Sequence, residues 1–357
     1  MGCMFHKAFW TIIEFPLKPK QTIMTVYEFD SVLVLGGATY LGGSFDVETA
    51  SPIFRISTNE GRSWEDTLRV PCNEIRDIYF NDGILLIRTS EYTGDSSLAL
   101  GAEVTYYKYE LGKRSLVKLK FPNNAQKTLV KIFNRQSYLF KEKKGRLGES
   151  FLKTTDGGES WSEYTVLMPI ETDYFEEISV VDGRIWGIRT HDRSLNEKND
   201  RDFQTLVSIN LNTWKIDKDI PMGETIRDEK NYKLNTHWVA DIKSLGNTLF
   251  ILGKDQVKNI GYIWKMDTSV NKIEMYSTFN LKKEQIPYKL FIYGKEIIFI
   301  YSDVSSYFPR YTLMYRKIDD SKWKVEKLPE MVSSKINFNN GTLIGVAEKN
   351  KLFFRKF

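Results

Sequence analysis

The sequence predicts an all-β repeat fold, because strand-like alternation of apolar and polar residues restarts after turn signals along the whole chain, and no helical period competes with it. The units recur at a spacing of roughly fifty residues, close to the length of one β-propeller blade. One turn motif also occurs twice, about two units apart. Together these observations predict a single domain over residues 1–357, a seven-bladed β-propeller of four-stranded antiparallel blades.

The innermost strand of each predicted blade follows a turn signal, and the expected starts are Thr22, Asn73, Lys127, Tyr174, Thr236, Tyr288 and Val332. The last unit is one strand short, since it supplies only residues 333–339, 342–348 and 352–356. Residues 9–15 form a strand that is left over at the beginning. If this N-terminal strand pairs into the last blade, the ring closes and exposed strand edges disappear. Six blades plus an extra hairpin is the alternative.

The repeated turn motif reads hydroxyl, any residue, Asp or Asn, any residue, Gly, any residue, Ser, Trp. The Asp or Asn side chain accepts backbone N–H bonds inside a tight turn, Gly supplies a positive φ, and Trp covers the turn where the next strand begins. Trp214 and Trp323 open later outer strands in a similar way and look like eroded copies. The motif positions are Ser57, Asn59, Gly61 and Trp64 in the first copy, and Thr154, Asp156, Gly158 and Trp161 in the second.

This motif resembles the Asp-box, or bacterial neuraminidase repeat, of sialidase-like β-propellers. The second copy matches the box fully, and the first has Asn59 in place of Asp. The resemblance implies that each copy joins the two outer strands of one blade. It covers two short segments and indicates architecture more than activity, because hydrolases, receptors and assembly factors all carry the box.

The composition indicates a globular protein that can bury a large core, since the chain has 357 residues, of which 41% are hydrophobic and 14% aromatic. The net charge of +5 is mild, and Lys and Arg are scattered, so the sequence does not favour nucleic-acid binding. Because no run of about 18 apolar residues occurs, we expect no transmembrane segment.

The two cysteines, Cys3 and Cys72, leave two roles open: a single disulfide between them, or a lipid anchor at Cys3. The start of the chain lacks the apolar core and cleavage site of a secretory signal. We therefore expect the protein to be periplasmic or secreted if this chain is a mature form, and cytoplasmic otherwise. We also expect a monomer. No spacing of Cys and His suits zinc, so we expect no cofactor, with calcium at the polar stretch 196–202 as the alternative.

Catalytic motifs are missing from the sequence, which favours a protein that is not an enzyme. Sialidases hold the substrate carboxylate with three arginines, the first in an Arg-Ile-Pro or Arg-Leu-Pro triplet near the N-terminus. The nearest triplet here, 69–71, has Val in the middle and follows the first turn motif instead of preceding it. Arg88, Arg189 and Arg310 fit solvated strand ends better than a convergent site, and no Gly-x-Ser-x-Gly elbow or fixed carboxylate pair occurs.

The connections of the predicted blades differ in length on the two faces of the ring. The first connection of each blade is a tight hairpin, whereas the second connections (39–50, 90–101, 140–149, 191–202 and 302–309) and the inter-blade segment 220–235 are long. Since loops on a rigid scaffold carry function, we expect the long-loop face and the channel mouth to bind a partner. The expected partner-binding residues are Tyr40, Phe45, Asp46, Tyr92, His191, Tyr232, Tyr307, Phe308 and Arg310.

The sequence therefore predicts a non-catalytic binding module for a protein partner. The resemblance implies a bacterial partner-binding propeller, either a periplasmic immunity protein that blocks the active site of a cognate toxin or a photosystem-assembly factor. The long loops, rich in acidic and aromatic residues, favour the immunity type. The alternative is a glycan-binding or glycoside-hydrolysing sialidase-like propeller.

Overall fold

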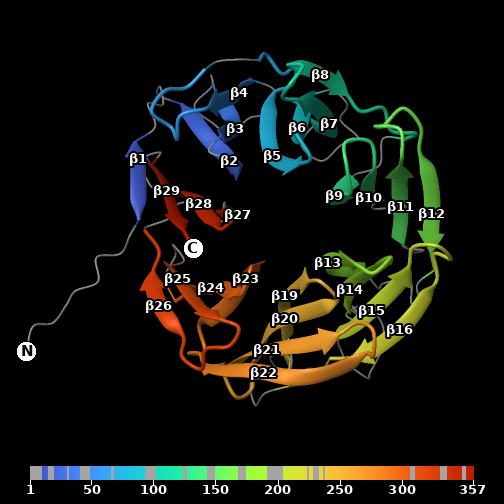
Figure 1. The fold of residues 1–357 in the computed structure, drawn as a ribbon, viewed down its shortest axis with the longest axis vertical. Coiled ribbons are helices and arrows are strands. Elements are labelled where there is room, and N and C mark those ends of the chain that lie inside the picture. The colour runs from blue at the N-terminus through green and yellow to red at the C-terminus, as the bar shows by residue number, and fades with distance from the viewer. Residues whose placement is uncertain are drawn as a thin grey trace, which may run out of the picture.

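The structure is a computed structural model that describes residues 10–14, 20–29, 32–40, 49–65, 68–92, 102–123, 127–142, 149–167, 174–190, 204–222, 225–227, 233–235, 238–305, 310–329, 336–347 and 351–357. These residues form seven antiparallel sheets arranged radially around a central hole, together with one separate hairpin and no helix (Figure 1). The predicted seven-bladed β-propeller is confirmed, and the six-blade alternative is wrong.

The blades are numbered in chain order, and the strands of each are given from the innermost outward. Blade 1 contains β2 (Gln21–Phe29), β3 (Val32–Tyr40) and β4 (Ala50–Ser57); blade 2 contains β5 (Glu74–Asn81), β6 (Ile84–Tyr92), β7 (Ala102–Glu110) and β8 (Ser115–Lys118); blade 3 contains β9 (Lys127–Ile132), β10 (Tyr138–Glu142), β11 (Glu149–Thr154) and β12 (Ser162–Val166). Blade 4 contains β13 (Tyr174–Val181), β14 (Arg184–Thr190), β15 (Gln204–Asn210) and β16 (Ile216–Pro221).

Blade 5 contains β19 (Trp238–Leu245), β20 (Thr248–Asp255), β21 (Ile260–Asp267) and β22 (Lys272–Asn280); blade 6 contains β23 (Gln285–Tyr293), β24 (Glu296–Asp303), β25 (Arg310–Lys317) and β26 (Lys324–Lys327); blade 7 contains β27 (Ile336–Asn339), β28 (Thr342–Ala347), β29 (Lys351–Lys356) and β1 (Thr11–Glu14). The inner strands begin within a few residues of their predicted starts.

Neighbouring blades bury the second strand of each blade on both faces. In β24 the four residues Ile297, Ile298, Phe299 and Ile300 all have 0% exposure, so apolar side chains occupy both sides of the strand. A strand that is covered on two faces reads as a continuous apolar run instead of an alternating one. This explains why the middle strands carry the most hydrophobic segments of the sequence.

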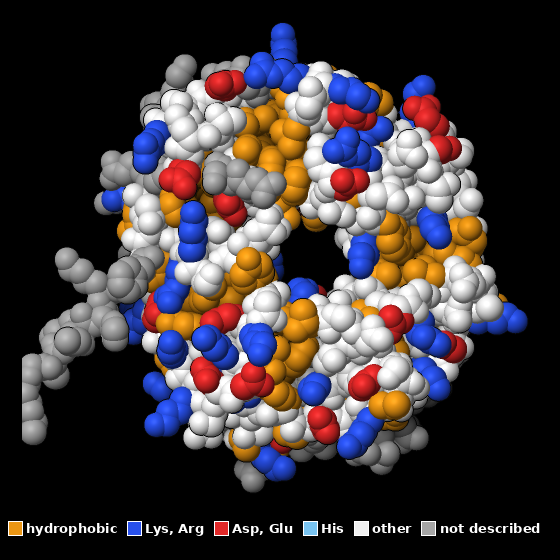
Figure 2. All heavy atoms as spheres, in the orientation of Figure 1, with side chains coloured by type: hydrophobic (Ala, Val, Ile, Leu, Met, Phe, Trp, Pro, Cys, Tyr) orange, Lys and Arg blue, Asp and Glu red, His pale blue; other side chains and the backbone are white. Residues whose placement is uncertain are grey.

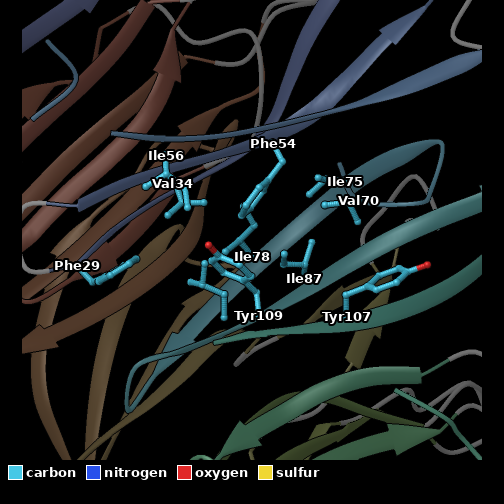
Figure 3. Close-up of a cluster of buried hydrophobic side chains, with 11 residues drawn as sticks. Phe29, Val34, Phe54, Ile56, Val70, Ile75, Ile78, Ile87, Tyr107 and Tyr109 are labelled. Carbon is cyan, nitrogen blue, oxygen red and sulfur yellow. The ribbon is translucent and has the colours of Figure 1, made fainter. Parts of the chain in front are cut away.

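The hydrophobic core is divided into clusters that lie between adjacent blades. Figure 3 shows the cluster between blades 1 and 2, where Phe54 and Ile56 of β4 meet Ile78 of β5 and Tyr109 of β7. The rings of Phe54 and Tyr109 are in edge contact at 5.9 Å. Because each blade buries its faces only against its neighbours, the cores form a series around the ring and do not fill its centre.

The N-terminal strand completes the last blade, as the sequence predicts. β1 pairs antiparallel with β29, with Thr11 opposite Phe354 and Glu14 opposite Lys351. Trp10 covers the buried ring of Phe353 edge-on, with the ring centres 5.4 Å apart. The two ends of the described chain therefore share one sheet, and the pairing satisfies the edge of β29.

Two features depart from a regular ring. Among the described residues, blade 1 has three strands, and an isolated bridge between Ile56 and Glu65 occupies its fourth position. The connection between blades 4 and 5 contains a hairpin of its own, β17 (Thr225–Arg227) with β18 (Lys233–Asn235).

Polar side chains join the innermost strands of successive blades. Lys131 of blade 3 donates to the carbonyl of Val180 in blade 4 (3.1 Å), and Asp241 of blade 5 accepts from the N–H of Leu290 in blade 6 (2.8 Å). Blades 1 and 2 are joined instead by the stacked rings of Phe29 and Phe80, 3.9 Å apart. The remaining links are Asn81 to Ile132, Ser179 to Ser244, Lys289 to Ile336, and Asn337 and Asn339 to Val26 and Glu28. Most of these links use a backbone N–H or carbonyl group of an innermost strand, which is the edge of its sheet.

Candidate binding surface

The order of strands within each blade sends its connections to two opposite ends of the ring. Successive strands are antiparallel neighbours, so the first and third connections of a blade emerge at one end, here called the turn end. The second connections and the segments between blades emerge at the other, here called the loop end. The topology therefore places the first connections of all blades at one end and the second connections at the other.

Both copies of the turn motif lie at the turn end and are held by their own side chains. In the second copy, between β11 and β12, Asp156 accepts the N–H groups of Glu159 (3.1 Å) and Ser160 (3.0 Å), and Gly158 adopts φ +99°. Hydrogen bonds from Ser160 and Thr154 hold the pKa of Asp156 below its ordinary value. In the first copy Asn59 accepts the N–H of Ser63 at 2.9 Å. These are the bonds that the motif predicts, and they lock the turn internally.

The tryptophans of the turn motif and its eroded copies pack on the preceding blade. Trp161 donates its indole N–H to the Lys120 carbonyl at 2.7 Å, and Trp323 donates to the Ser277 hydroxyl at 3.2 Å. Trp214 stacks on Tyr164 of blade 3 with ring centres 3.9 Å apart. Trp64 packs against a core cluster that includes Ile344 of blade 7. The repeated tryptophan is therefore a contact between blades.

The structure describes three of the nine predicted partner-binding residues. Tyr92 is 40% exposed at the loop end of β6, and Arg310 is exposed at the start of β25. Tyr40 is only 4% exposed, and its hydroxyl donates to Glu74 at 2.5 Å, so this side chain presents almost no surface to a partner. The other six lie outside the described residues: Phe45, Asp46, His191, Tyr232, Tyr307 and Phe308.

Of the three arginines at loop-facing strand ends, Arg88 and Arg189 bond within their own blades. Arg88 donates to Asp77 at 2.8 Å, and Arg189 donates to Asp219 at 2.5 Å. Arg189 is 4% exposed, which leaves it little access to a ligand. These contacts give each of the two side chains a structural role in its own sheet.

A β-bulge recurs at the same place in six of the inner strands, and it shapes the central channel. In each case two residues of the inner strand face one residue of the second strand. A bulge increases local twist and re-aims side chains. The extra residues are Met24, Arg76, Val130, Glu177, Ala240 and Tyr288.

Charged side chains next to these bulges face the channel. Lys289 of blade 6 interacts electrostatically with Asp77 of blade 2, although Figure 1 shows that these blades are not neighbours. Only side chains that point into the hole can meet across it, and Figure 2 shows that hole open, with basic side chains at its rim. Burial lowers the pKa of Lys289, and Asp241 opposes that effect.

Glu177 stands out among the channel charges because its carboxyl group hydrogen-bonds with a second carboxyl, Asp241. It occupies a bulge with φ +36°, a conformation that a non-glycine residue rarely adopts. The Glu177 side chain is exposed, but the loss of hydration caused by surrounding protein atoms and the negative charge of Asp241 raise the pKa of Glu177 to about 7, while Lys243 opposes the shift. Asp241 itself is bonded to Lys243 at 2.6 Å.

Sequence reasoning missed these channel residues, and no motif marks them. The available signal is an acidic residue in the middle of an inner strand, such as Asp77 in β5 or Asp241 in β19. Within the described part of the chain, no group of three or more His, Cys, Asp or Glu residues forms a metal-binding cluster. A search of the same residues also finds no helix long and apolar enough to cross a membrane.

Comparison with solved structures shows the propeller fold. A structure titled as YCF48 bound to D1 peptide matches with a TM-score of 0.55 and 12% identity, covering 98% of this chain and 97% of that one. A prolyl endopeptidase matches with a TM-score of 0.53 and 6% identity over 86% of this chain, which corresponds to 42% of that longer chain. An oligogalacturonate lyase in complex with manganese matches with a TM-score of 0.50 and 10% identity, covering 92% and 80%.

No model of a known protein family matches the sequence, and no curated protein matches it. At identities this low, the structural matches establish the fold and not the activity. The Asp-box assignment therefore stays a prediction, supported by the hydrogen bonds of the two turns.

Proposed function

We propose that this protein is a non-catalytic binding module that holds a protein partner at the loop end of the ring and at the mouth of the central channel. The observation that carries the proposal is the division of the two ends. The turn end carries the first connections of the blades, most of which are two-residue turns, and turns with internal hydrogen bonds, whereas long gaps between strands, such as those after β3, β6 and β14, lie at the loop end. A rigid ring that carries long segments at one end is suited to recognition.

Two further findings support binding over catalysis. The similar propeller of almost equal length is titled as bound to a peptide, so this architecture accommodates a polypeptide ligand in that protein. In the present chain, Arg88 and Arg189 are engaged in ion pairs within their blades and are therefore poorly placed to hold a substrate carboxylate. As a more specific form of the proposal, the partner is a toxin whose active site this chain blocks.

The test is capture of partners with the immobilised protein, comparing the wild type with two variants. Tyr92→Ala combined with Arg310→Ala alters two exposed residues of the loop end. Val270→Ala combined with Lys295→Ala is the matched control, because both residues are exposed at the turn end. We expect one stoichiometric partner that is retained by the wild type and by the control but lost from the loop-end variant.

Loss of the partner from the turn-end control alone would reverse the assignment of the two ends. A glycan array and a panel of fluorogenic glycosides test the alternative function in parallel. Sugar binding or turnover by the purified protein would contradict the proposal. For the toxin-blocking form, co-expression with the captured partner should restore the growth of cells that the partner alone inhibits.

A further inference from the structure

Three connections of blades 5 and 6 meet at the loop end and form one continuous surface, here called the blade 5/6 platform. It comprises residues 255–260 between β20 and β21, residues 281–285 between β22 and β23, and residues 303–305 at the end of β24, together with Arg310. Residues 255–260 and 281–285 are described without a gap, whereas several other connections at the loop end are described only in part.

A buried lysine holds the backbone of residues 282–285 in place. Lys254 is 3% exposed, and its ammonium group donates to three backbone carbonyls, those of Lys282 (3.0 Å), Lys283 (2.9 Å) and Gln285 (2.9 Å). Burial lowers the pKa of Lys254, but the three carbonyls satisfy all the donors of its charged form. The side chain therefore contributes no charge at the surface and positions the loop that carries Lys282 and Lys283.

Backbone hydrogen bonds join the three segments to one another. The N–H of Leu281 donates to the Asn259 carbonyl at 3.0 Å, and the N–H of Val304 donates to the Glu284 carbonyl at 3.0 Å. Asp255 accepts the N–H groups of Val257 and Lys258. Because these bonds are made within the protein, a ligand that docks on the platform does not have to order its loops first.

The side chains that the platform exposes are mainly basic. Lys258 has 72% side-chain exposure, and Lys282, Lys283 and Arg310 are also exposed. Of the platform's three acidic residues, Asp255 is 7% exposed and lies 3.8 Å from the Lys258 ammonium group, Asp303 is partly exposed, and Glu284 is exposed, so exposed basic residues still outnumber exposed acids.

Asp303 interacts electrostatically with two of the basic residues. Hydrogen bonds from Ser305, followed by the charges of Lys282 and Arg310, hold the pKa of Asp303 below its ordinary value. Arg310 lies opposite Asp303 in the β24–β25 ladder, so Lys282 and Arg310 both act on one carboxylate, although they come from different connections. Val257 (42% exposed) and Val304 (47% exposed) add apolar contacts between the charges.

We propose that the blade 5/6 platform binds an acidic polypeptide segment whose apolar side chains pack on Val257 and Val304 while its carboxylates meet Lys258, Lys282, Lys283 and Arg310. This inference rests on the proposed function and specifies the chemistry of the partner. Charge complementarity supports a polypeptide with Asp and Glu. A single-stranded nucleic acid fits less well, because the exposed apolar residues of the platform are valines and offer no aromatic surface on which bases could stack.

The first test is selection of random 12-residue peptides displayed on phage against the full-length protein. The expected result is enrichment of sequences that combine Asp or Glu with apolar residues. A fluorescent copy of the most enriched peptide then gives affinities by anisotropy. Binding should weaken several-fold between roughly 50 and 200 mM salt, because exposed charge pairs are screened over that range. Enrichment without acidic residues would overturn the proposal.

The second test is charge reversal with a matched control. Lys282→Glu combined with Lys283→Glu should weaken peptide binding by about tenfold or more. Lys295→Glu combined with Lys322→Glu makes the same change of charge at exposed residues of the turn end and should leave affinity unchanged. Equal weakening by both variants would show that only net charge matters and would overturn the platform as the site.

Two more measurements separate this inference from its alternatives. Lys254→Gln leaves the exposed charges in place, so in a variant that still folds by circular dichroism we expect weaker binding with an unchanged salt dependence. Equal affinity for a fluorescent oligonucleotide, or for vesicles containing an anionic lipid, would overturn the proposal for an acidic polypeptide. A captured partner that binds the Lys282→Glu/Lys283→Glu variant as well as the wild type would overturn the platform while leaving the proposed function intact.

Discussion

Replacing Trp161 tests the conclusion that the repeated tryptophans hold adjacent blades together. The indole ring lies 4.7 Å from Phe121 and 5.6 Å from Phe140, and its N–H donates to the Lys120 carbonyl. Each aromatic pair contributes about 0.5–1.5 kcal/mol and the hydrogen bond about 1 kcal/mol, so Trp161→Ala should lower the free energy of unfolding by about 2–4 kcal/mol. Trp161→Phe keeps the ring contacts and loses the hydrogen bond, which predicts a loss of about 1 kcal/mol.

The assay is urea unfolding followed by far-ultraviolet circular dichroism, with calorimetry for Tm. With an unfolding entropy of about 2.1 cal/mol/K per residue, the loss for Trp161→Ala corresponds to a fall in Tm of about 3–5 °C. Val325→Ala is the control, because Val325 is 58% exposed on the outer strand β26 and should cost less than about 0.5 kcal/mol. If Trp161→Ala costs no more than this control, the tryptophan does not stabilise the contact between blades and the reasoning is refuted.

Three further predictions concern the channel, the core and the ring closure. In the folded protein the pKa of Glu177 is raised to about 7, so the stability associated with its neutral form is fully present below its ordinary pKa and is lost as pH rises through about 7. Glu177→Gln should therefore be more stable than the wild type at pH 8 and similar to it at pH 5. Equal differences in Tm between the two proteins at both pH values would contradict this. Gly261→Ala should cost about 1–3 kcal/mol in urea unfolding, since a Cβ there would overlap the Phe279 ring, whereas Gly112→Ala, with nothing near its Cβ position, should cost far less. Deleting residues 1–15 should lower the urea midpoint and cause concentration-dependent association in light scattering through the freed edge of β29, whereas deleting residues 1–9 should do neither.

Most of the architecture could be predicted because it is repeated. A tight turn after each inner strand and a Trp at the start of several outer strands recur often enough to count the blades. The surplus strand at the start and the missing strand at the end predicted the closure of the ring, and the pairing of Thr11 with Phe354 confirms it. The isolated bridge in blade 1 could not be predicted, because the first turn motif leads one to expect an outer strand where the described residues have the bridge to Glu65.

The site was harder to predict because its parts come from distant segments. Tyr40 adjoins a loop and reads as exposed, but Glu74 of the next blade accepts its hydroxyl and the side chain is buried. Lys254 looks like an ordinary basic residue at a strand end, and nothing in the sequence shows that three carbonyls converge on it. The charges of Asp77 and Lys289 influence one another only because the ring places blades 2 and 6 on opposite sides of one channel.

The pairing of β1 with β29 also determines how the molecule would respond to mechanical tension. Thr11 lies opposite Phe354, so both strands lead to the chain ends on the same side of their ladder. Hydrogen bonds in an antiparallel ladder run perpendicular to the strands. A pull on the two ends would therefore load these bonds successively, as in a zipper, and peel the outermost strand away before any other blade is strained.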